Sequence, residues 1–216
     1  GEPRFADVLR AVDAAGIERL RFATSHPKDL TDEVIGLFAT LPSLMPALHL
    51  PVQSGSNRIL SAMNRRYTRE HYLGLIEKLR RARPDIALST DIIVGFPGET
   101  EENFMDTYRL VEEVGYSQVF TFIYSKREGT PAAEMDDDTP REVIQERFDR
   151  LVDLVQRKSF EANQAELGAT VPVLVEGTSK RDDSILAGKS PKNQTVHAPI
   201  PAGMDIESLV GRIVDV

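Results

Sequence analysis

A carboxylate inside an apolar segment is the first feature of this sequence that could do chemistry. The stretch "STDIIVGFPGETEENF" at 89–104 places Asp91 in a run apolar enough for a buried strand, and the run breaks at Gly95 and Gly98. Burying a carboxylate is costly unless a hydrogen-bond donor or a positive charge meets it. Asp91 is therefore predicted either to bind a ligand or to pair with a group inside the fold.

Arginines are the second candidate group. Residues 58–83 contain eight Lys or Arg against two Glu, although the whole chain carries a net charge of -8. Arg65 and Arg66 stand in a predicted loop, which favours a phosphate or carboxylate site because a guanidinium binds such groups bidentately. Arg80 and Arg81 stand on a predicted helix and are candidates for RNA binding, with a solvated helix face as the alternative.

Composition excludes several function classes. The sequence has no Cys, which excludes disulfides, cysteine nucleophiles and thiolate-held zinc or iron–sulfur sites within these residues. No apolar run approaches the roughly 18 residues of a membrane span, and the first ten residues lack the features of a signal peptide. We expect a cytoplasmic protein with no membrane partner. Because the sequence begins without Met in a helix-like segment, we also expect it to be part of a longer protein.

Periodicity predicts alternating helices and strands in the first 138 residues. Helical patterns cover 5–16, 30–41, 56–63, 68–82 and 100–115, and strand patterns cover 18–25, 47–53, 85–96 and 117–125. Thr31, Thr68 and Thr100 stand in N-cap positions. Such alternation calls for parallel strands joined by helical crossovers, as in a βα barrel or a doubly wound sheet.

Each predicted strand is followed by a polar or glycine-containing segment. These four segments are 25–27, 53–56, 95–100 and 125–131. Ligands of parallel α/β folds bind at the carboxyl ends of the strands, so the four segments are expected to face one site. Candidate cavity-lining residues are His26, Ser54, Ser56 and Tyr124. The alternatives are helix capping, turn formation and an ordinary structural histidine.

The pattern changes at Thr139. Residues 139–168 predict one long linking helix, with Thr139 and Glu142 in capping-box positions and Pro140 at the first helical position. Residues 169–216 alternate with period two between turn residues and predict a small all-β, OB-like domain. Its candidate RNA-binding residues are Lys180, Arg181, Lys189, Lys192 and Asn193. A stabilising domain without RNA is the alternative.

Four segments carry a resemblance to a known family. "HLPVQSGSNRIL", "DIIVGFPGETEENF", "FIYSKREGTPAAEM" and "VLVEGTSK" occur in the order and spacing of MiaB-type tRNA methylthiotransferases, over nearly the whole chain. The resemblance implies the C-terminal part of a partial radical S-adenosylmethionine (SAM) βα barrel at 1–138, followed by the linking helix. It also implies an RNA-binding TRAM domain at 169–216, incomplete at its C-terminus.

The same resemblance implies an activity. Enzymes of this type convert N6-isopentenyladenosine at tRNA position 37 to its 2-methylthio derivative, using SAM and two [4Fe-4S] clusters. The anticodon stem-loop of tRNA and a reductant protein are the implied partners. Without Cys this chain lacks both cluster-binding regions, so alone it is expected to be inactive, because no electron can reach SAM.

The resemblance also implies which residues of this chain bind SAM. In similar barrels a Gln and an Asp on neighbouring strands bind the ribose hydroxyls of SAM, and Gln53 and Asp91 match them. Arg65 matches an Arg that pairs with the methionine carboxylate. These types suit those groups, because an amide both donates and accepts and a carboxylate accepts two hydroxyls.

Three further residues of the same motif are implied in SAM binding. Ile93 is expected to lie against the adenine, and Gly95 and Gly98 are expected to let backbone approach the nucleoside without a Cβ.

Other readings stay open at this stage. A RimO-type enzyme methylthiolates an aspartate of a ribosomal protein, and a third branch acts on threonylcarbamoyladenosine in tRNA. "SHP" and "HLPVQSGS" favour the MiaB type over the RimO type. A non-catalytic RNA-binding protein on a degenerate barrel is the alternative from another class.

Overall fold

A parallel three-stranded sheet organises the first part of the chain. The computed structural model describes residues 4–23, 26–164, 166–201 and 203–216. Strands β1 (Ala47–His49), β2 (Ala87–Val94) and β3 (Gln118–Ile123) lie side by side in that order, and both pairings are parallel. This arrangement confirms the predicted α/β class with helical crossovers.

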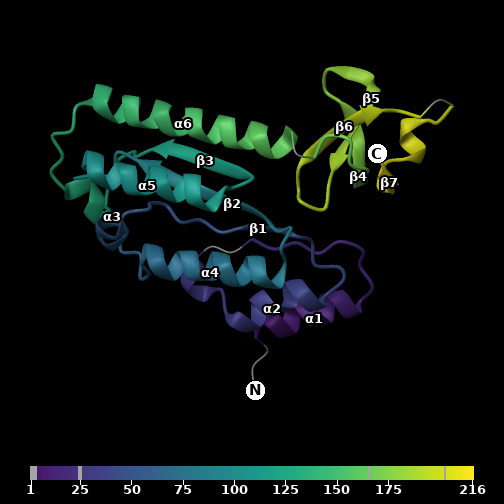
Figure 1. Cartoon of the computed structure of the whole chain (residues 1–216), viewed down its shortest axis with the longest axis horizontal. Coiled ribbons are helices and arrows are strands. Elements are labelled where there is room, and N and C mark those ends of the chain that lie inside the picture. The colour runs from purple at the N-terminus through teal and green to yellow at the C-terminus, as the bar shows by residue number, and fades with distance from the viewer. Residues whose placement is uncertain (1–3, 24–25, 165, 202) are drawn as a thin grey trace.

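Helices connect and cover these strands. They are α1 (Phe5–Ala14), α2 (Asp32–Thr40), α3 (Asn57–Ala62), α4 (Arg69–Ala82) and α5 (Glu101–Val114), with short 3-10 turns η1 (Pro27–Asp29) and η2 (Pro131–Glu134). The side chains of Thr31, Thr68 and Thr100 accept N–H bonds at the starts of α2, α4 and α5, as their cap positions predicted. In Figure 1, α1, α2 and α4 group on one side of β1, and α5 and α6 on the other.

The predicted strand at 18–25 does not form a ladder. The structure shows isolated bridges from Leu20 to Leu44 and from Ala23 to His49. The Leu20 N–H donates to the Ser43 carbonyl, and the Leu20 carbonyl accepts the Met45 N–H. The segment is therefore paired at isolated residues and not along a continuous ladder. Residues 24 and 25, with the predicted Ser25 end of this strand, lie outside the described residues.

The strand predicted at 47–53 is shorter than expected. Pro51 has no N–H to donate, and regular pairing stops at His49. Thr90 bridges the irregular stretch, because its hydroxyl donates to the Leu50 carbonyl at 3.0 Å and accepts the Val52 N–H at 2.9 Å. The chain rejoins β2 at Gln53, which forms an isolated bridge to Ile92.

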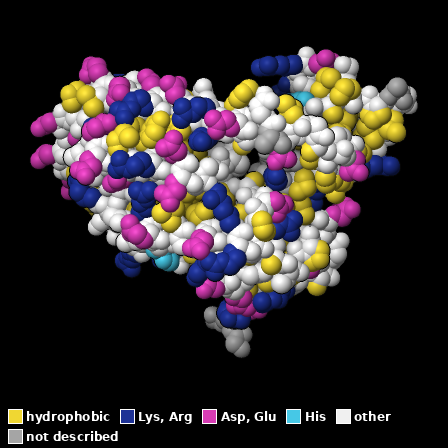
Figure 2. Space-filling model, in the orientation of Figure 1, with side chains coloured by type: hydrophobic (Ala, Val, Ile, Leu, Met, Phe, Trp, Pro, Cys, Tyr) yellow, Lys and Arg dark blue, Asp and Glu magenta, His cyan; other side chains and the backbone are white. Residues whose placement is uncertain are grey.

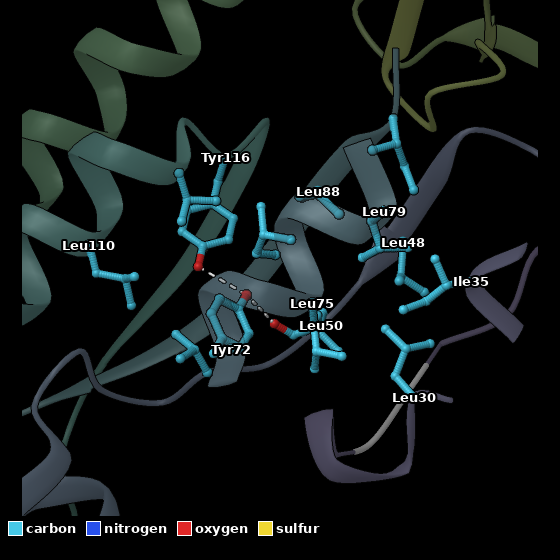
Figure 3. Close-up of a cluster of buried hydrophobic side chains, with 14 of the residues drawn as sticks. Leu30, Ile35, Leu48, Leu50, Tyr72, Leu75, Leu79, Leu88, Leu110 and Tyr116 are labelled. Carbon is cyan, nitrogen blue, oxygen red and sulfur yellow. Dashed lines mark hydrogen bonds between the residues drawn. The ribbon is translucent and has the colours of Figure 1, made fainter. Parts of the chain in front are cut away.

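A large apolar core lies between the sheet and its helices. At its centre Tyr72 is fully buried, and its hydroxyl donates to the Leu50 carbonyl at 2.9 Å while accepting the Tyr116 hydroxyl at 2.9 Å (Figure 3). The two phenols are thus satisfied inside an otherwise apolar cluster that includes Leu48 and Leu79. This core fixes the sheet on which any ligand site must stand.

The two faces of β2 differ in burial. Leu88, Thr90, Ile92 and Val94 are buried against the helices. The intervening residues point to the other face and are half-exposed. Asp91 therefore lies on the open face of the sheet, which a sequence pattern of mostly apolar residues did not reveal.

A 24-residue helix, α6 (Arg141–Gln164), leads to the second sheet. It begins two residues after Thr139, whose N–H and hydroxyl both donate to Asp137 at 3.2 and 2.7 Å. The sequence predicted that Thr139 forms a capping box with Glu142. In the structure Thr139 instead donates both hydrogen bonds to Asp137. Leu151 and Leu154 of α6 belong to the main core.

The C-terminal sheet is antiparallel and has the order β6-β5-β4-β7. Its elements are β4 (Pro172–Ser179), β5 (Asp182–Lys189), β6 (Thr195–Pro199), η3 (Ile206–Ser208) and β7 (Ile213–Asp215). A small separate core contains Val175, Leu186 and Leu209. This curled sheet agrees with the predicted OB-like domain.

Candidate ligand site at the carboxyl ends of the strands

A cavity of about 710 Å³ opens at the carboxyl ends of the parallel strands, and we call it the strand-end cavity. Its walls come from the β1–α3 and α3–α4 connections, from β2 and β3, and from the segment that follows β3. The lining residues that the sequence had singled out are Gln53, Arg65, Asp91, Ile93 and Tyr124. Side chains up to 71 positions apart in sequence thus meet at one place.

Gln53 stands in an unusual backbone conformation. Its φ of 72° is in the left-handed region that residues other than Gly seldom adopt. Two hydrogen bonds hold it there: its N–H donates to the Asp91 carbonyl at 2.9 Å and its carbonyl accepts the Ile93 N–H at 3.0 Å. The residue is 8% exposed and its side-chain amide makes no hydrogen bond to the described residues. A strained residue with an unused amide is typical of a ligand site.

Asp91 has one neighbour of potentially opposite charge. Its Oδ2 lies 3.5 Å from Nε2 of His49, and Nδ1 of His49 lies 3.0 Å from the hydroxyl of Ser89. The Asp91 carboxylate is 28% exposed and also lines the strand-end cavity. The sequence predicted a ligand or an internal partner for Asp91, and the structure provides the partner beside an open cavity.

Arg65 follows Asn64, whose left-handed backbone (φ 55°) turns the chain after α3. Within the described part of the chain no carboxylate pairs with the Arg65 guanidinium. Close by, Tyr67 donates its hydroxyl to the Val52 carbonyl at 2.8 Å, and burial raises the pKa of Tyr67 to about 12. An arginine without an acidic partner can bind an anionic ligand group.

His26 feels the charge of this arginine but is not among the residues that line the cavity. Its ring meets the edge of Tyr67 with centroids 5.2 Å apart, and its Nδ1 accepts the Lys28 N–H. Burial, and then the positive charge of Arg65, lower the pKa of His26.

Tyr124 carries a buried hydroxyl without a hydrogen-bond partner among the described residues. Its ring packs edge-on against Phe96, with centroids 5.2 Å apart. Buried hydroxyls are nearly always hydrogen-bonded, so this one is an exception in the wall of the strand-end cavity.

Four other predicted residues do not line this cavity. Ser54 and Ser56 are buried and bind Thr107 and Asn103 of α5, at 3.2 and 3.0 Å. They fasten the loop after β1 to a helix. The sequence showed their position after a strand but could not show that α5 lies against them.

The two glycines of the loop after β2 also have other neighbours. A Cβ on Gly95 would lie 2.5 Å from Cγ2 of Ile144 on α6. The exposed Gly98 faces Arg58 and not the cavity, and its carbonyl accepts a hydrogen bond from that side chain. Their positive φ values, 72° and 78°, favour Gly in the turn. Close packing on α6 accounts for the missing side chain at Gly95.

Several lining residues were not singled out individually from the sequence. They are Ala62, Met63, Asn64, Phe96, Phe122, Ile123, Ser125, Arg127, Thr130, Pro131 and Ala132. The segment 125–131 as a whole was expected at the site. Within it, Arg127 is the residue whose type, an arginine, indicates binding to an anionic ligand. Phe122 is 51% exposed, an exposure that a strand pattern alone does not predict.

A second cavity of about 710 Å³ lies between the open sheet face and the β4–β7 domain, and we call it the interdomain cavity. From the sheet side it is lined by Arg21, His49, Ser89 and Phe120, among others, and from the second domain by Lys189, Lys192, Asn193, Gln194 and Thr195. Lys189 donates to the Thr195 hydroxyl at 2.8 Å, and Lys192 pairs with Glu166. Its lysines therefore already have partners.

The remaining candidate RNA-binding residues are dispersed. Lys180 and Arg181 are exposed at the turn between β4 and β5. Arg80 donates to the Val114 carbonyl at the end of α5, and Arg81 pairs with Glu77 at 2.6 Å. On the face shown in Figure 2, basic and acidic side chains are intermixed. This face shows no continuous basic stripe.

The described residues contain no site that could hold a metal ion or a metal cluster. No group of three or more His, Asp or Glu side chains stands close enough to hold a metal ion there, and the sequence has no Cys. Among the described helices none is both long and apolar enough to cross a membrane.

Comparison with known families matches residues 2–111 to the Radical SAM superfamily. The chain belongs to the radical SAM superfamily. Among solved structures, the radical SAM enzyme coproporphyrinogen III oxidase (HemN) of Escherichia coli aligns with a TM-score of 0.52 over 77% of this chain and 45% of its own, at 13% identity. That likeness concerns the fold.

Curated relatives are more similar in sequence. The tRNA-2-methylthio-N(6)-dimethylallyladenosine synthases of Acetivibrio thermocellus and Alkaliphilus oremlandii are 50% and 51% identical over 213 residues, 98% of this chain. These matches cover 43% and 44% of the relatives, so the chain spans less than half the length of either protein.

Radical SAM proteins use SAM together with an iron–sulfur cluster. Thiolates hold such clusters, and this chain can supply none. Considering only the part of the chain that the structure describes, the strand-end cavity offers an amide without a hydrogen bond, a guanidinium without an acidic partner, a carboxylate and a buried phenol without a partner. Of the two cofactors, the residues present fit only SAM.

Proposed function

We propose that the strand-end cavity binds SAM. The observation that supports this most is the convergence of Gln53, Asp91 and Arg65 on one cavity of a radical SAM chain. Asp91 and Gln53 would bind the two ribose hydroxyls, because a carboxylate accepts both and an amide can donate or accept. Arg65 would pair with the methionine carboxylate, for which no competing acid is present among the described residues.

The other lining residues divide the cavity into a polar and an apolar part. Ile93, Phe96 and Phe122 present apolar surface that suits the adenine ring. Tyr124 would give its hydroxyl to a ligand acceptor. When SAM is bound beside a reduced iron–sulfur cluster, it supplies radical chemistry to the site. The residues of this chain hold and orient the nucleoside and keep water from its apolar face.

For the full-length protein we propose methylthiolation of C2 in N6-dimethylallyladenosine at tRNA position 37. The names of relatives about 50% identical over nearly all of this chain support this activity. Two [4Fe-4S] clusters, a reductant protein and the anticodon stem-loop belong to the same proposal. This chain alone would bind without reacting, because its residues include no cluster ligand.

Mass spectrometry of tRNA tests the activity. The full-length parent protein is reconstituted anaerobically with iron and sulfide and incubated with SAM, reductant and tRNA that carries dimethylallyladenosine. A 2-methylthio mass gain on that nucleoside is expected. Cleavage of SAM without this gain would overturn the tRNA assignment and favour the ribosomal-protein aspartate or another nucleoside as substrate.

A comparison of two ligands tests the role of Arg65. We expect Arg65→Met to weaken SAM binding by about tenfold or more, because a charge-assisted hydrogen bond is lost. 5′-Methylthioadenosine has no methionine carboxylate, so its affinity is expected to stay unchanged. Equal losses for both ligands in calorimetry would contradict the assignment of Arg65 to the carboxylate. Arg66→Met, at the adjacent exposed arginine, is the matched control.

RNA binding by the β4–β7 domain is the third part of the proposal. Lys180 and Arg181 are exposed on one turn of an OB-like domain, where they can reach phosphates. Replacing both by Glu is expected to weaken tRNA binding and to reduce its dependence on salt concentration. The control is Arg109→Glu, an exposed arginine of α5 outside this domain. Unaltered binding and salt dependence in the first variant would contradict the footprint.

A further inference from the structure

We propose that His49 is a positioning residue for Asp91, which it holds in the orientation that binds ligand. This inference rests on the proposed SAM site. His49 and Ser89 are paired in the parallel register of β1 and β2, and Asp91 follows two residues later on the same face. The three side chains therefore stand in a row, with Ser89 Oγ 3.0 Å from His49 Nδ1 and His49 Nε2 3.5 Å from Asp91 Oδ2.

The chemistry of these groups fixes the direction of the row. An ionised carboxylate only accepts hydrogen bonds, so the proton toward Asp91 must stand on Nε2 of His49. In the neutral imidazole Nδ1 is then an acceptor, and the Ser89 hydroxyl can donate to it. The Ser89 hydroxyl thus selects the tautomer that directs the Nε2 proton of His49 toward Asp91, whose Oδ2 lies 3.5 Å away.

Packing restricts the imidazole ring. His49 meets Phe120 edge-on, with ring centroids 5.9 Å apart, and Phe120 is the β3 partner of Asp91 in the sheet register. The ring is thus enclosed by Phe120, Ser89 and Asp91. A ring held on these sides can fix the direction of the carboxylate without touching the ligand.

The row also separates the two cavities. His49 and Ser89 line the interdomain cavity, whereas Asp91 lines the strand-end cavity. His49 therefore approaches Asp91 from the side away from the proposed SAM. Because each carboxylate oxygen can accept two hydrogen bonds, contact with Nε2 leaves both oxygens with capacity for the ribose hydroxyls.

Two polar substitutions at the same position separate positioning from folding. The amide nitrogen of Gln can reach about as far as Nε2 of His, and that of Asn about as far as Nδ1. His49→Gln is expected to keep SAM affinity near that of the wild type. His49→Asn is expected to weaken it by about three- to tenfold, because the donor to Asp91 is lost while a polar group remains beside Ser89.

Calorimetry with SAM on the reconstituted full-length protein measures these affinities. If His49 acts through Asp91, His49→Asn has no further effect in an Asp91→Asn background. His71→Asn, at an exposed histidine of α4, is the control and should bind like the wild type. Thermal midpoints of all variants are compared to confirm that they are folded.

Three results are distinguishable. A loss for His49→Asn, rescue by His49→Gln and non-additivity with Asp91→Asn support the inference. Wild-type affinity of His49→Asn, or an equal loss in both backgrounds, overturns it while the SAM site stands. Wild-type affinity of Asp91→Asn itself overturns the proposed site, and the inference with it.

Discussion

The strand-end cavity and the interdomain cavity each have a volume of about 710 Å³, and they differ in the state of their polar groups. Around the first, the Gln53 amide and the Tyr124 hydroxyl have no hydrogen bond to the described residues. Around the second, Lys189 and Lys192 are already bound to Thr195 and Glu166. A buried polar atom without a partner among the described residues, the Tyr124 hydroxyl, and not volume, therefore distinguishes the strand-end cavity from the interdomain cavity.

The largest expected effect is on the unfolding free energy and comes from Glu99, in the loop between β2 and α5. Glu99 is buried there, accepts the Gly95 N–H at 2.8 Å and lies 3.9 Å from Arg147. Burial raises the pKa of Glu99 to about 7, against the lowering effects of the Gly95 bond and of Arg147. The folded chain thus binds a proton that the unfolded chain releases near its ordinary carboxyl pKa. Its contribution to stability is present below that pKa and is lost as pH rises through about 7.

Urea unfolding of the chain at pH 5 and pH 8 tests this contribution. Wild type is expected to lose up to roughly 3 kcal/mol of unfolding free energy between these values relative to Glu99→Gln, whose amide does not titrate. Parallel pH dependence in the two proteins would contradict the raised pKa of Glu99. The interdomain cavity has no comparable buried acid among the described residues that line it.

Asp91→Ala is the next largest change and concerns ligand binding. We expect SAM affinity of the reconstituted full-length protein to fall by about 10- to 150-fold, because hydrogen bonds to a charged group are lost. Calorimetry measures this loss. Unchanged affinity would remove the distinction between the two cavities, since Asp91 would then serve the fold alone.

Tyr124→Phe tests whether the buried hydroxyl meets a ligand. Without SAM the variant should be as stable as the wild type or slightly more so, because an unsatisfied polar atom is removed. With SAM, affinity is expected to fall by about two- to tenfold, the contribution of one neutral hydrogen bond. Thermal unfolding with and without SAM measures both terms. A loss of stability without SAM would show that the hydroxyl is satisfied within the protein.

Lys192→Ala tests the interdomain cavity and is expected to have the smallest effect. The pair with Glu166 is partly exposed, with 28% and 36% of the two side chains accessible. Solvent screening limits such pairs to about 0–1 kcal/mol, so the thermal midpoint should change little. SAM affinity should equal that of the wild type. A clear loss of SAM affinity would show that this cavity also serves the ligand.

Local signals predicted the fold well. Thr31, Thr68 and Thr100 marked helix starts correctly, because a cap depends on residues within one turn. The strand predicted at 18–25 was wrong, since a ladder needs a partner that the local pattern does not contain. The sequence also could not show that Gly95 packs on Ile144, a residue 49 positions later.

The candidate site was predicted in part. The strand-end rule brought Gln53, Asp91 and Tyr124 to one cavity, as expected for a parallel sheet. Ser54 and Ser56 followed the same rule but face α5, because the rule gives the end of a strand and not the direction of each side chain. The neighbour of Asp91, His49, belongs to another strand and became visible only from the register.

Helix α6 sets a length in this molecule. Ile144 near its start packs on Gly95, beside the strand-end cavity, and Asn163 near its end lies 3.4 Å from Gln194 of the β4–β7 domain. The 19 residue steps from Ile144 to Asn163 span about 28 Å of straight helix, at 1.5 Å per step. A helix is stiff over this length, so α6 keeps these two contacts at a fixed distance from each other. In the proposed enzyme it would set how far the nucleotide that reacts stands from the nucleotides that the second domain grips.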